Sequence, residues 1–248
     1  MQFILSLMIS FSLSTALLAA GMNTSNITLL PHQQKTLNYL IKNPNQKGLL
    51  LAHSLGSGKT FLSLAFGERF PRKKKIVILP RFLKSNWKIQ IKKFGIKTPD
   101  QYELLSMEEA AAKVGKINYK DCIVIIDEVH KLVERVKRSY APEHLNYGKL
   151  YFSLWNADHI LALTGTPIYS SPIDIAFLLN LVSGKSQLTF DQEIFRREYT
   201  VVSHNRSLFR GYFWESKVID AVIPVLGLFA PMVFLPLDLL SWGLIGSS

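Results

Sequence analysis

The segment Gly56–Thr60, with the sequence Gly-Ser-Gly-Lys-Thr, has the residue types of a loop that binds phosphate groups. Glycines let successive backbone N–H groups close around an anion, while the lysine supplies a cation and the hydroxyl an oxygen ligand. The loop follows the apolar run Leu49–Leu51 and precedes an amphipathic segment, which is the strand–loop–helix context that this motif requires. We therefore predict that Lys59 contacts the β- and γ-phosphates of ATP and that Thr60 binds Mg²⁺.

The complete motif begins at His53, a position where such loops usually have their first glycine. A helix that starts at the end of the loop adds the positive end of its dipole to the site. The nucleotide-binding residues that this motif predicts are His53, Ser54, Leu55, Gly56, Ser57, Gly58, Lys59 and Thr60.

Two adjacent carboxylates, Asp127 and Glu128, follow the apolar run Ile123–Ile126. Four apolar residues predict a buried strand, and its carboxyl end is where ligands bind in open α/β sheets. Asp127 is predicted to bind Mg²⁺, and Glu128 to orient or deprotonate the attacking water. Together with Lys59 they form a predicted catalytic group for ATP hydrolysis.

Short apolar runs alternate with amphipathic segments from Thr28 to about Ser183. The apolar runs are continuous, as expected of parallel strands that are buried on both faces. The predicted strands are Gly48–Ala52, Lys75–Leu79, Tyr102–Leu105, Cys122–Asp127 and His159–Thr164. The predicted helices are Gln33–Ile41, Thr60–Arg69, Phe82–Phe94, Met107–Val114, Val129–Val136, Tyr147–Trp155 and Ile173–Leu181. This pattern predicts an α/β fold with a doubly wound parallel sheet.

Several segments resemble the superfamily 2 helicases, in the order of that family's motifs. Asp127–His130 resembles motif II in its Asp-Glu-x-His form, and Leu163–Pro167 resembles motif III. Leu30–Gln33 resembles the adenine-reading segment before the phosphate loop. Leu79–Phe94, with its Pro80 and its spaced Leu83, Trp87 and Ile91, resembles motif Ia of the Swi/Snf-type branch. The His53-containing loop and the segment from Thr164 to Tyr169 also resemble ATPases of large DNA viruses.

The resemblance implies a RecA-like domain that works as the N-terminal half of an ATP-dependent helicase or translocase on DNA or RNA. It assigns the reading of adenine to Gln33. The residues that it implies in coupling ATP to nucleic-acid contacts are His130, Thr164, Gly165 and Thr166. No Gln-x-x-Gly-Arg-x-x-Arg motif follows Pro167, so we expect a second RecA-like domain or chain to supply the arginine finger.

A basic surface is predicted on the motif Ia segment. Lys84, Lys88 and Lys92 recur every four residues beside its apolar face, and Arg72–Lys75 adds positive charge nearby. Such a surface would bind phosphates without reading sequence, although a solvated charged face gives the same pattern. The formal net charge of +11 also suits a nucleic acid or an anionic membrane. The predicted nucleic-acid contacts are Arg81, Lys84 and Lys88.

Apolar segments at both ends predict extensions outside the ATP-binding domain, which we expect at residues 28–185. Residues 1–22 fit a signal peptide, a membrane anchor or a buried helix, and residues 186–217 are mixed in character. Residues 218–248 form an apolar tail that three prolines interrupt. The expected location is inside a cell or a virion, with association to a membrane through these ends.

Two other classes of function fit part of the sequence. The terminal apolar segments also fit a nucleotide-binding module that is held at a membrane and has no catalytic activity. A P-loop ATPase of another branch would need a transporter signature or a sensor arginine, which we do not find. The single cysteine, Cys122, excludes a disulfide within the chain and a zinc site made of cysteines.

Overall fold

A computed structural model of the protein describes residues 29–52 and 56–199. Its centre is a five-stranded sheet in which all neighbouring strands run parallel, in the order β1-β5-β4-β2-β3. The strands are β1 (Gly48–Ala52), β2 (Lys75–Leu79), β3 (Tyr102–Ser106), β4 (Ile123–Ile126) and β5 (His159–Thr164). The α/β fold with a parallel sheet is thus confirmed, and three of the five strands have the predicted bounds.

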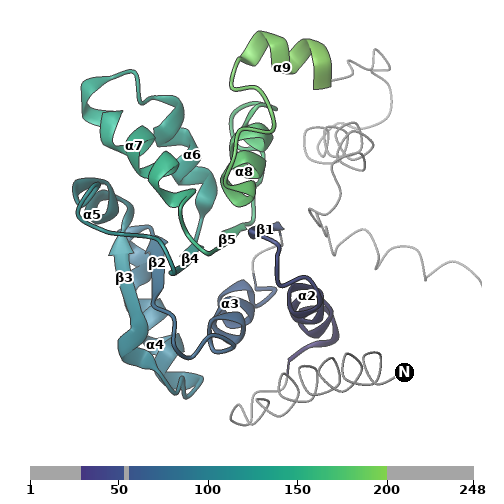
Figure 1. Ribbon diagram of the computed structural model, residues 1–248, viewed down its shortest axis with the longest axis vertical. Coiled ribbons are helices and arrows are strands. Elements are labelled where there is room, and N and C mark those ends of the chain that lie inside the picture. The colour runs from purple at the N-terminus through teal and green to yellow at the C-terminus, as the bar shows by residue number, and fades with distance from the viewer. Residues whose placement is uncertain (1–28, 53–55, 200–248) are drawn as a thin grey trace, which may run out of the picture.

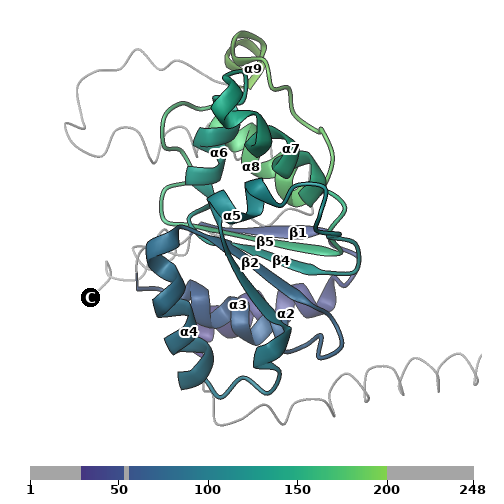
Figure 2. The ribbon, with the colours of Figure 1, turned by 90° about the vertical axis from the view of Figure 1, so that its left-hand side faces the viewer.

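Helices cover both faces of the sheet (Figures 1 and 2). One face carries α2 (Pro31–Lys42), α3 (Lys59–Gly67) and α4 (Lys84–Lys93). The other carries α5 (Met107–Ala112), α6 (Val129–Lys137), α7 (Leu145–Leu154) and α8 (Asp174–Ser183), with α9 (Gln192–Tyr199) beyond α8. Three short 3₁₀ turns connect elements, at Arg81–Leu83, Pro99–Gln101 and Pro142–His144.

The apolar side chains form two cores, one on each face of the sheet. In β2, Ile76 and Ile78 belong to the core under α5–α8, whereas Val77 and Leu79 belong to the core under α2–α4. This alternation follows from the strand geometry, which points successive side chains to opposite faces. Because both faces are buried, the strands consist mainly of apolar residues, with polar side chains at strand ends and at Glu103 in the edge strand β3.

All seven predicted helices are present, but each differs from its predicted bounds by one or two residues at one end or at both. The predicted helix Phe82–Phe94 begins instead with the 3₁₀ turn Arg81–Leu83, because the proline at position 80 sets an extended backbone before it, and α4 starts only at Lys84. Residues 186–217, which the sequence shows to be mixed in character, include α9, a helix that was not predicted. Its Phe195 is buried against the core, which stabilises a helix that is otherwise polar.

The predicted terminal segments lie outside the described residues. This applies to residues 1–22, to the tail at residues 218–248, and to the mixed extension after residue 199. Among the helices that the structure describes, none is both long and apolar enough to cross a bilayer.

Replacement of Gly48 tests how closely β1 approaches its neighbours. A Cβ atom at this position would lie 2.5 Å from the carbonyl oxygen of Val182 and 2.6 Å from that of Ile160. Both are backbone atoms, so Gly48→Ala should destabilise the protein by about 1–3 kcal/mol, measured by denaturant unfolding.

The matched control is Gly148→Ala in α7. There the new Cβ would meet only the side chain of Ser139, at 3.0 Å from its Oγ, which can rotate away. Since alanine also favours the helix, the change should stay below about 1 kcal/mol. Equal destabilisation by the two variants would contradict the role given to the backbone contact at Gly48.

Candidate nucleotide and magnesium site

The candidate site lies at the carboxyl edge of the three adjacent strands β1, β5 and β4. The phosphate loop follows β1, Thr164 ends β5, and the carboxylates follow β4. Parallel strands place their carboxyl ends at one edge of the sheet, where ligands bind in this class of fold. The structure thus brings together residue groups that are separated by up to about a hundred positions in the sequence.

The described part of the phosphate loop depends on two glycines with left-handed backbone. Gly56 has φ 82° and Gly58 has φ 79°, a region that residues with a side chain rarely adopt. At Gly58 a Cβ would also lie 2.2 Å from Nε2 of Gln33. His53, Ser54 and Leu55 lie outside the described residues, so their predicted roles stay predictions.

Gln33 links the first described helix to the phosphate loop. Its side chain is 3% exposed; its Oε1 accepts from the backbone N–H of Leu30 at 2.9 Å, and its Nε2 donates to the carbonyl of Ser57 at 3.0 Å. One N–H and one lone pair of the amide remain for a ligand. Sequence reasoning placed Gln33 near the nucleotide but missed its direct contact with the loop.

Lys59 starts α3 and is buried. Burial lowers the pKa of its ammonium group, and the negative charges of Glu128 and Asp127 oppose this change. These charges act on Lys59 because the end of β4 and the start of α3 face the same edge. The predicted catalytic group is therefore assembled in space, with its cation beside its two carboxylates.

Asp127 is buried, and hydrogen bonds hold both of its carboxylate oxygens. The backbone N–H of Glu128 donates to Oδ1 at 3.0 Å, and the indole Nε1–H of Trp87 donates to Oδ2 at 2.8 Å. Burial raises the pKa of Asp127, while the hydrogen bond from Trp87 lowers it. Trp87 packs on the sheet, as a large apolar residue of the motif Ia helix can, but no sequence pattern indicated the hydrogen bond.

Glu128 has a backbone conformation that is rare for a residue with a side chain. Its φ is 51° and its ψ is 49°, in the left-handed region. Such strain concentrates at functional sites, where the surrounding structure enforces it. Here the conformation turns the chain from β4 into α6, and Oε2 of Glu128 lies 3.3 Å from Nδ1 of His130.

His130 joins this group to the end of β5. Its Nδ1 lies 3.0 Å from Oγ1 of Thr164, and Thr164 Oγ1 also accepts from the backbone N–H of Thr166 at 3.0 Å. The ring of Tyr169 stacks on the imidazole at 5.4 Å between centroids. Three of the four predicted coupling residues are thus in one hydrogen-bonded chain, and Gly165 lies between two of them.

The loop after Thr166 is held by one buried carboxylate, which sequence reasoning missed. Asp174 accepts from the backbone N–H groups of Tyr169, Ser170 and Ser171 at 2.7–3.2 Å and pairs with Lys137 Nζ at 2.6 Å. This arrangement lowers the pKa of Asp174 despite its burial. The only signal in the sequence was an aspartate at a helix start after two serines.

The residues at this edge fit a magnesium ion. Carboxylate and hydroxyl oxygens are the protein ligands that Mg²⁺ prefers, and the ion usually keeps several waters and shares phosphate oxygens. Asp127 supplies a carboxylate whose oxygens each retain a lone pair, and Thr60 supplies a hydroxyl on the first turn of α3. Bound Mg²⁺ would neutralise negative charge on the β- and γ-phosphates of ATP.

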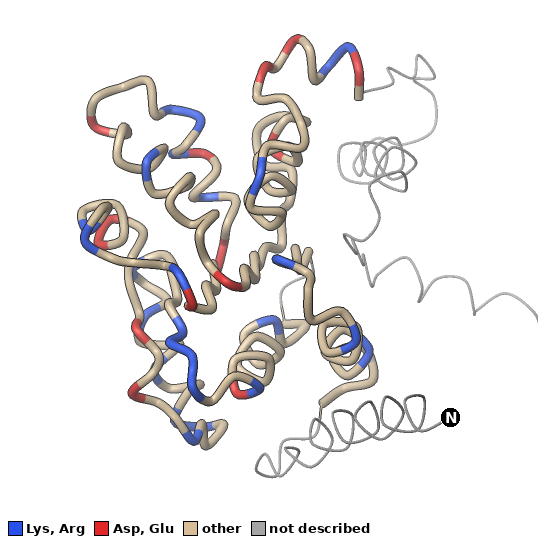
Figure 3. Tube along the Cα trace, in the orientation of Figure 1, with Lys and Arg blue, Asp and Glu red and all other residues tan. Residues whose placement is uncertain are grey.

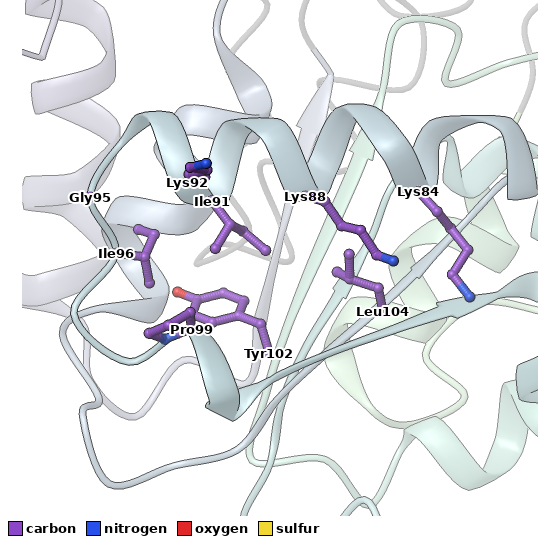
Figure 4. Close-up of a pocket in the computed structure, with 9 residues that line it drawn as sticks. All are labelled: Lys84, Lys88, Ile91, Lys92, Gly95, Ile96, Pro99, Tyr102 and Leu104. Carbon is purple, nitrogen blue, oxygen red and sulfur yellow. The ribbon is translucent and has the colours of Figure 1, made fainter.

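The predicted nucleic-acid contacts lie on and before α4, where Lys and Arg recur (Figure 3). Arg81 is exposed in the turn before the helix. Lys84 is paired with Glu109 at 2.7 Å, the residue that caps the start of α5. Lys88, with Lys84 and Lys92, lines a pocket of about 600 Å³ between α4 and β3 (Figure 4).

Comparisons with known proteins agree with this geometry. Residues 26–116 match the family described as Type III restriction enzyme, res subunit. Over 178 residues the chain is 29% identical to the early transcription factor 70 kDa subunit of Yaba monkey tumor virus, covering 64% of this chain and 26% of that protein. By these comparisons the chain is related to the N-terminal ATPase domain of the superfamily 2 helicases.

A second viral relative and a solved structure extend the comparison. The termination factor NPH-I homolog of African swine fever virus is 28% identical over 189 residues, which are 66% of this chain and 26% of that protein. The Sulfolobus solfataricus SWI2/SNF2 ATPase core in complex with dsDNA superposes with a TM-score of 0.53 and 20% identity, covering 71% of this chain and 40% of that chain. The chain spans about a quarter of the length of the two viral relatives.

The protonation of His130 predicts how stability depends on pH. Burial lowers the pKa of its imidazole below the ordinary value of 6.5, so the folded state favours the neutral ring. The corresponding stability is fully present above that value and is lost as the pH falls towards the folded pKa. Between about pH 7.5 and pH 5.5, the wild type should lose more unfolding free energy than His130→Gln.

Denaturant unfolding at several pH values measures this difference. Burial also lowers the pKa of His159, but that histidine is present in both proteins and its contribution cancels. Parallel pH profiles of the wild type and the variant would contradict the prediction.

Proposed function

We propose that the chain is the ATPase domain of a helicase or translocase, which binds and hydrolyses ATP with Mg²⁺ and drives movement along a nucleic acid together with a second RecA-like domain. The observation that carries the proposal is the convergence of Lys59, Asp127, Glu128 and the His130–Thr164 pair at one sheet edge. In the proposed domain, residues 28–185 form the ATP-binding unit.

Each side chain has a role that follows from its position. Lys59 contacts the β- and γ-phosphates, while Thr60 and Asp127 bind the metal. Glu128 lies next to Asp127 at the open end of β4, where it can orient or deprotonate the attacking water. Gln33 would bind adenine through the second N–H of Nε2 and the second lone pair of Oε1, which its hydrogen bonds to Ser57 and Leu30 do not use.

A chain of contacts from Glu128 to the loop after β5 supports a coupling role. Glu128 contacts His130, His130 contacts Thr164, and Thr164 holds the N–H of Thr166. A change in the position of Glu128 on hydrolysis would therefore alter the support of this loop. Asp174 and Lys137 hold its far end, so the loop is anchored at both sides.

Nucleic acid is the proposed polymer because of the basic residues on α4. Arg81 and Lys88 are exposed, and Lys84 would exchange Glu109 for a phosphate. Phosphate contacts of this kind carry no sequence information, which suits a motor that moves along its track. Because the Sulfolobus SWI2/SNF2 ATPase core was solved in complex with dsDNA, duplex DNA is the first polymer to test.

ATP hydrolysis tests the catalytic assignment. Lys59→Ala should lose most of its ATP affinity, because the phosphates lose their cation. Glu128→Gln should bind Mg-ATP normally but hydrolyse it at least about 100-fold more slowly, since a general base contributes about that much. The measurement is phosphate release with and without duplex DNA, beside nucleotide binding.

Lys149→Ala is the matched control, since this lysine is exposed on α7 at the other face of the sheet. Normal ATP binding by Lys59→Ala would refute the site assignment. ATP binding without hydrolysis by the wild type, with any nucleic acid, would favour a nucleotide-binding module that has no catalytic activity.

The salt dependence of DNA binding tests the basic surface. Each lysine that contacts a phosphate adds about 0.9 to the slope of log affinity against log salt concentration. The double variant Lys84→Gln/Lys88→Gln should therefore bind duplex DNA more weakly, with a slope smaller by about 2. Fluorescence anisotropy at several salt concentrations measures both quantities.

The control, Lys120→Gln/Lys149→Gln, makes the same change in net charge at exposed positions away from α4. If the two double variants behave alike, only the net charge matters and α4 is not the contact surface.

A further inference from the structure

We infer that Trp87 is a positioning residue for Asp127: its indole N–H holds the carboxylate in the orientation that binds Mg²⁺, and thereby ties α4 to the nucleotide site. The inference rests on the proposed function, because it takes Asp127 as a metal ligand. It adds a link between the metal and the basic helix that is separate from the His130–Thr164 pair.

The contact between Trp87 and Asp127 is buried and well formed. Nε1 of Trp87 lies 2.8 Å from Oδ2 of Asp127, and the side chains are 0% and 8% exposed respectively. Among the residues of α4, all of which the structure describes, Trp87 alone is buried. The one fully buried side chain of α4 is therefore the one that donates a hydrogen bond to the carboxylate proposed to bind the metal.

Packing alone does not require an indole at this position. Phenylalanine or leucine would fill an apolar space without a polar atom, whereas leaving a buried indole N–H without an acceptor costs free energy. The acceptor is a carboxylate 40 positions away in sequence, and the bond is charge-assisted and thus stronger than a neutral one. The residue type at position 87 is accordingly explained by what its nitrogen does.

The geometry of the two hydrogen bonds explains how orientation is set. The N–H of Glu128 holds Oδ1 and the indole holds Oδ2, so rotation of the carboxylate about its Cβ–Cγ bond breaks at least one of them. Each oxygen keeps a second lone pair for Mg²⁺ or for a water that the metal carries. Hydrogen-bonding partners of this kind orient metal ligands, and their loss weakens metal affinity about 10- to 100-fold.

The position of Trp87 on α4 gives the contact a second consequence. Lys84 and Lys88 lie three positions before and one position after it, on the surface proposed to contact nucleic acid. A shift of α4 on binding a polymer would move the indole and with it the support of Asp127. The 3₁₀ turn at Arg81–Leu83, directly after β2, joins this helix to the same edge of the sheet.

The test compares Trp87→Phe with Trp155→Phe in the full chain. The first variant keeps an aromatic ring but loses the N–H, and the second makes the same change after α7, against the core on the other face of the sheet. At a fixed concentration of a fluorescent ATP analogue, the Mg²⁺ concentration for half-maximal binding should rise about 10-fold in Trp87→Phe. Nucleotide affinity in EDTA should stay unchanged, and Trp155→Phe should match the wild type in both measurements.

Two results would overturn the inference. An unchanged Mg²⁺ requirement in Trp87→Phe would show that the indole does not support the carboxylate. An equal loss of affinity in Mg²⁺ and in EDTA would show a packing defect with no specific effect on the metal. Asp127→Asn separates the two proposals: if it leaves the Mg²⁺ requirement intact, the metal assignment itself is wrong.

A second measurement covers the case in which Trp87→Phe does not fold. The chain has four tryptophans, and replacing Trp155, Trp214 and Trp242 in turn by phenylalanine assigns the ¹⁵N-indole resonance of Trp87 by elimination. Adding Mg²⁺ to the wild-type protein with bound nucleotide should shift this resonance and leave that of Trp155 in place. A Trp87 resonance that does not respond to Mg²⁺ would refute the inference.

Discussion

Parallel pairing of β1, β5 and β4 is the constraint on which the candidate site depends. Ala52 pairs with Thr164, and Ile126 pairs with Ala162, so the ends of these strands stand in line at one edge of the sheet. Helices on both faces bury the strands. The backbone hydrogen bonds between the strands fix this register, so one strand cannot slide along its neighbour. The residues that follow each strand therefore meet without any long-range recognition of their own.

The second constraint is a buried negative charge at that edge. A carboxylate at the end of a buried strand is destabilised unless hydrogen bonds or cations compensate for its lost hydration. Here Trp87, the N–H of Glu128 and the charge of Lys59 do so, each from a different element. The contacts that compensate for the lost hydration of Asp127 also orient its carboxylate. Stability and the proposed function therefore depend on the same contacts.

Residue patterns predicted the strands more accurately than the ends of the helices. Continuous apolar runs predicted all five strands, since burial on both faces selects apolar residues throughout. The phosphate loop and the paired carboxylates were found because their chemistry needs given residue types at adjacent positions. Errors came at helix ends, as at Arg81, and α9, in which Phe195 is buried, was not predicted at all.

The sequence by itself determined the fold class, the strands and the local motifs, because these depend on residues that are neighbours in the chain. Only the tertiary structure decided the strand order, the bond of Gln33 to Ser57, the bond of Trp87 to Asp127 and the anchoring of a loop by Asp174. Each of these features brings together residues that are far apart in the sequence or whose contact does not follow from the local sequence. Their meeting depends on how helices pack on the sheet, which no local pattern of residue types records.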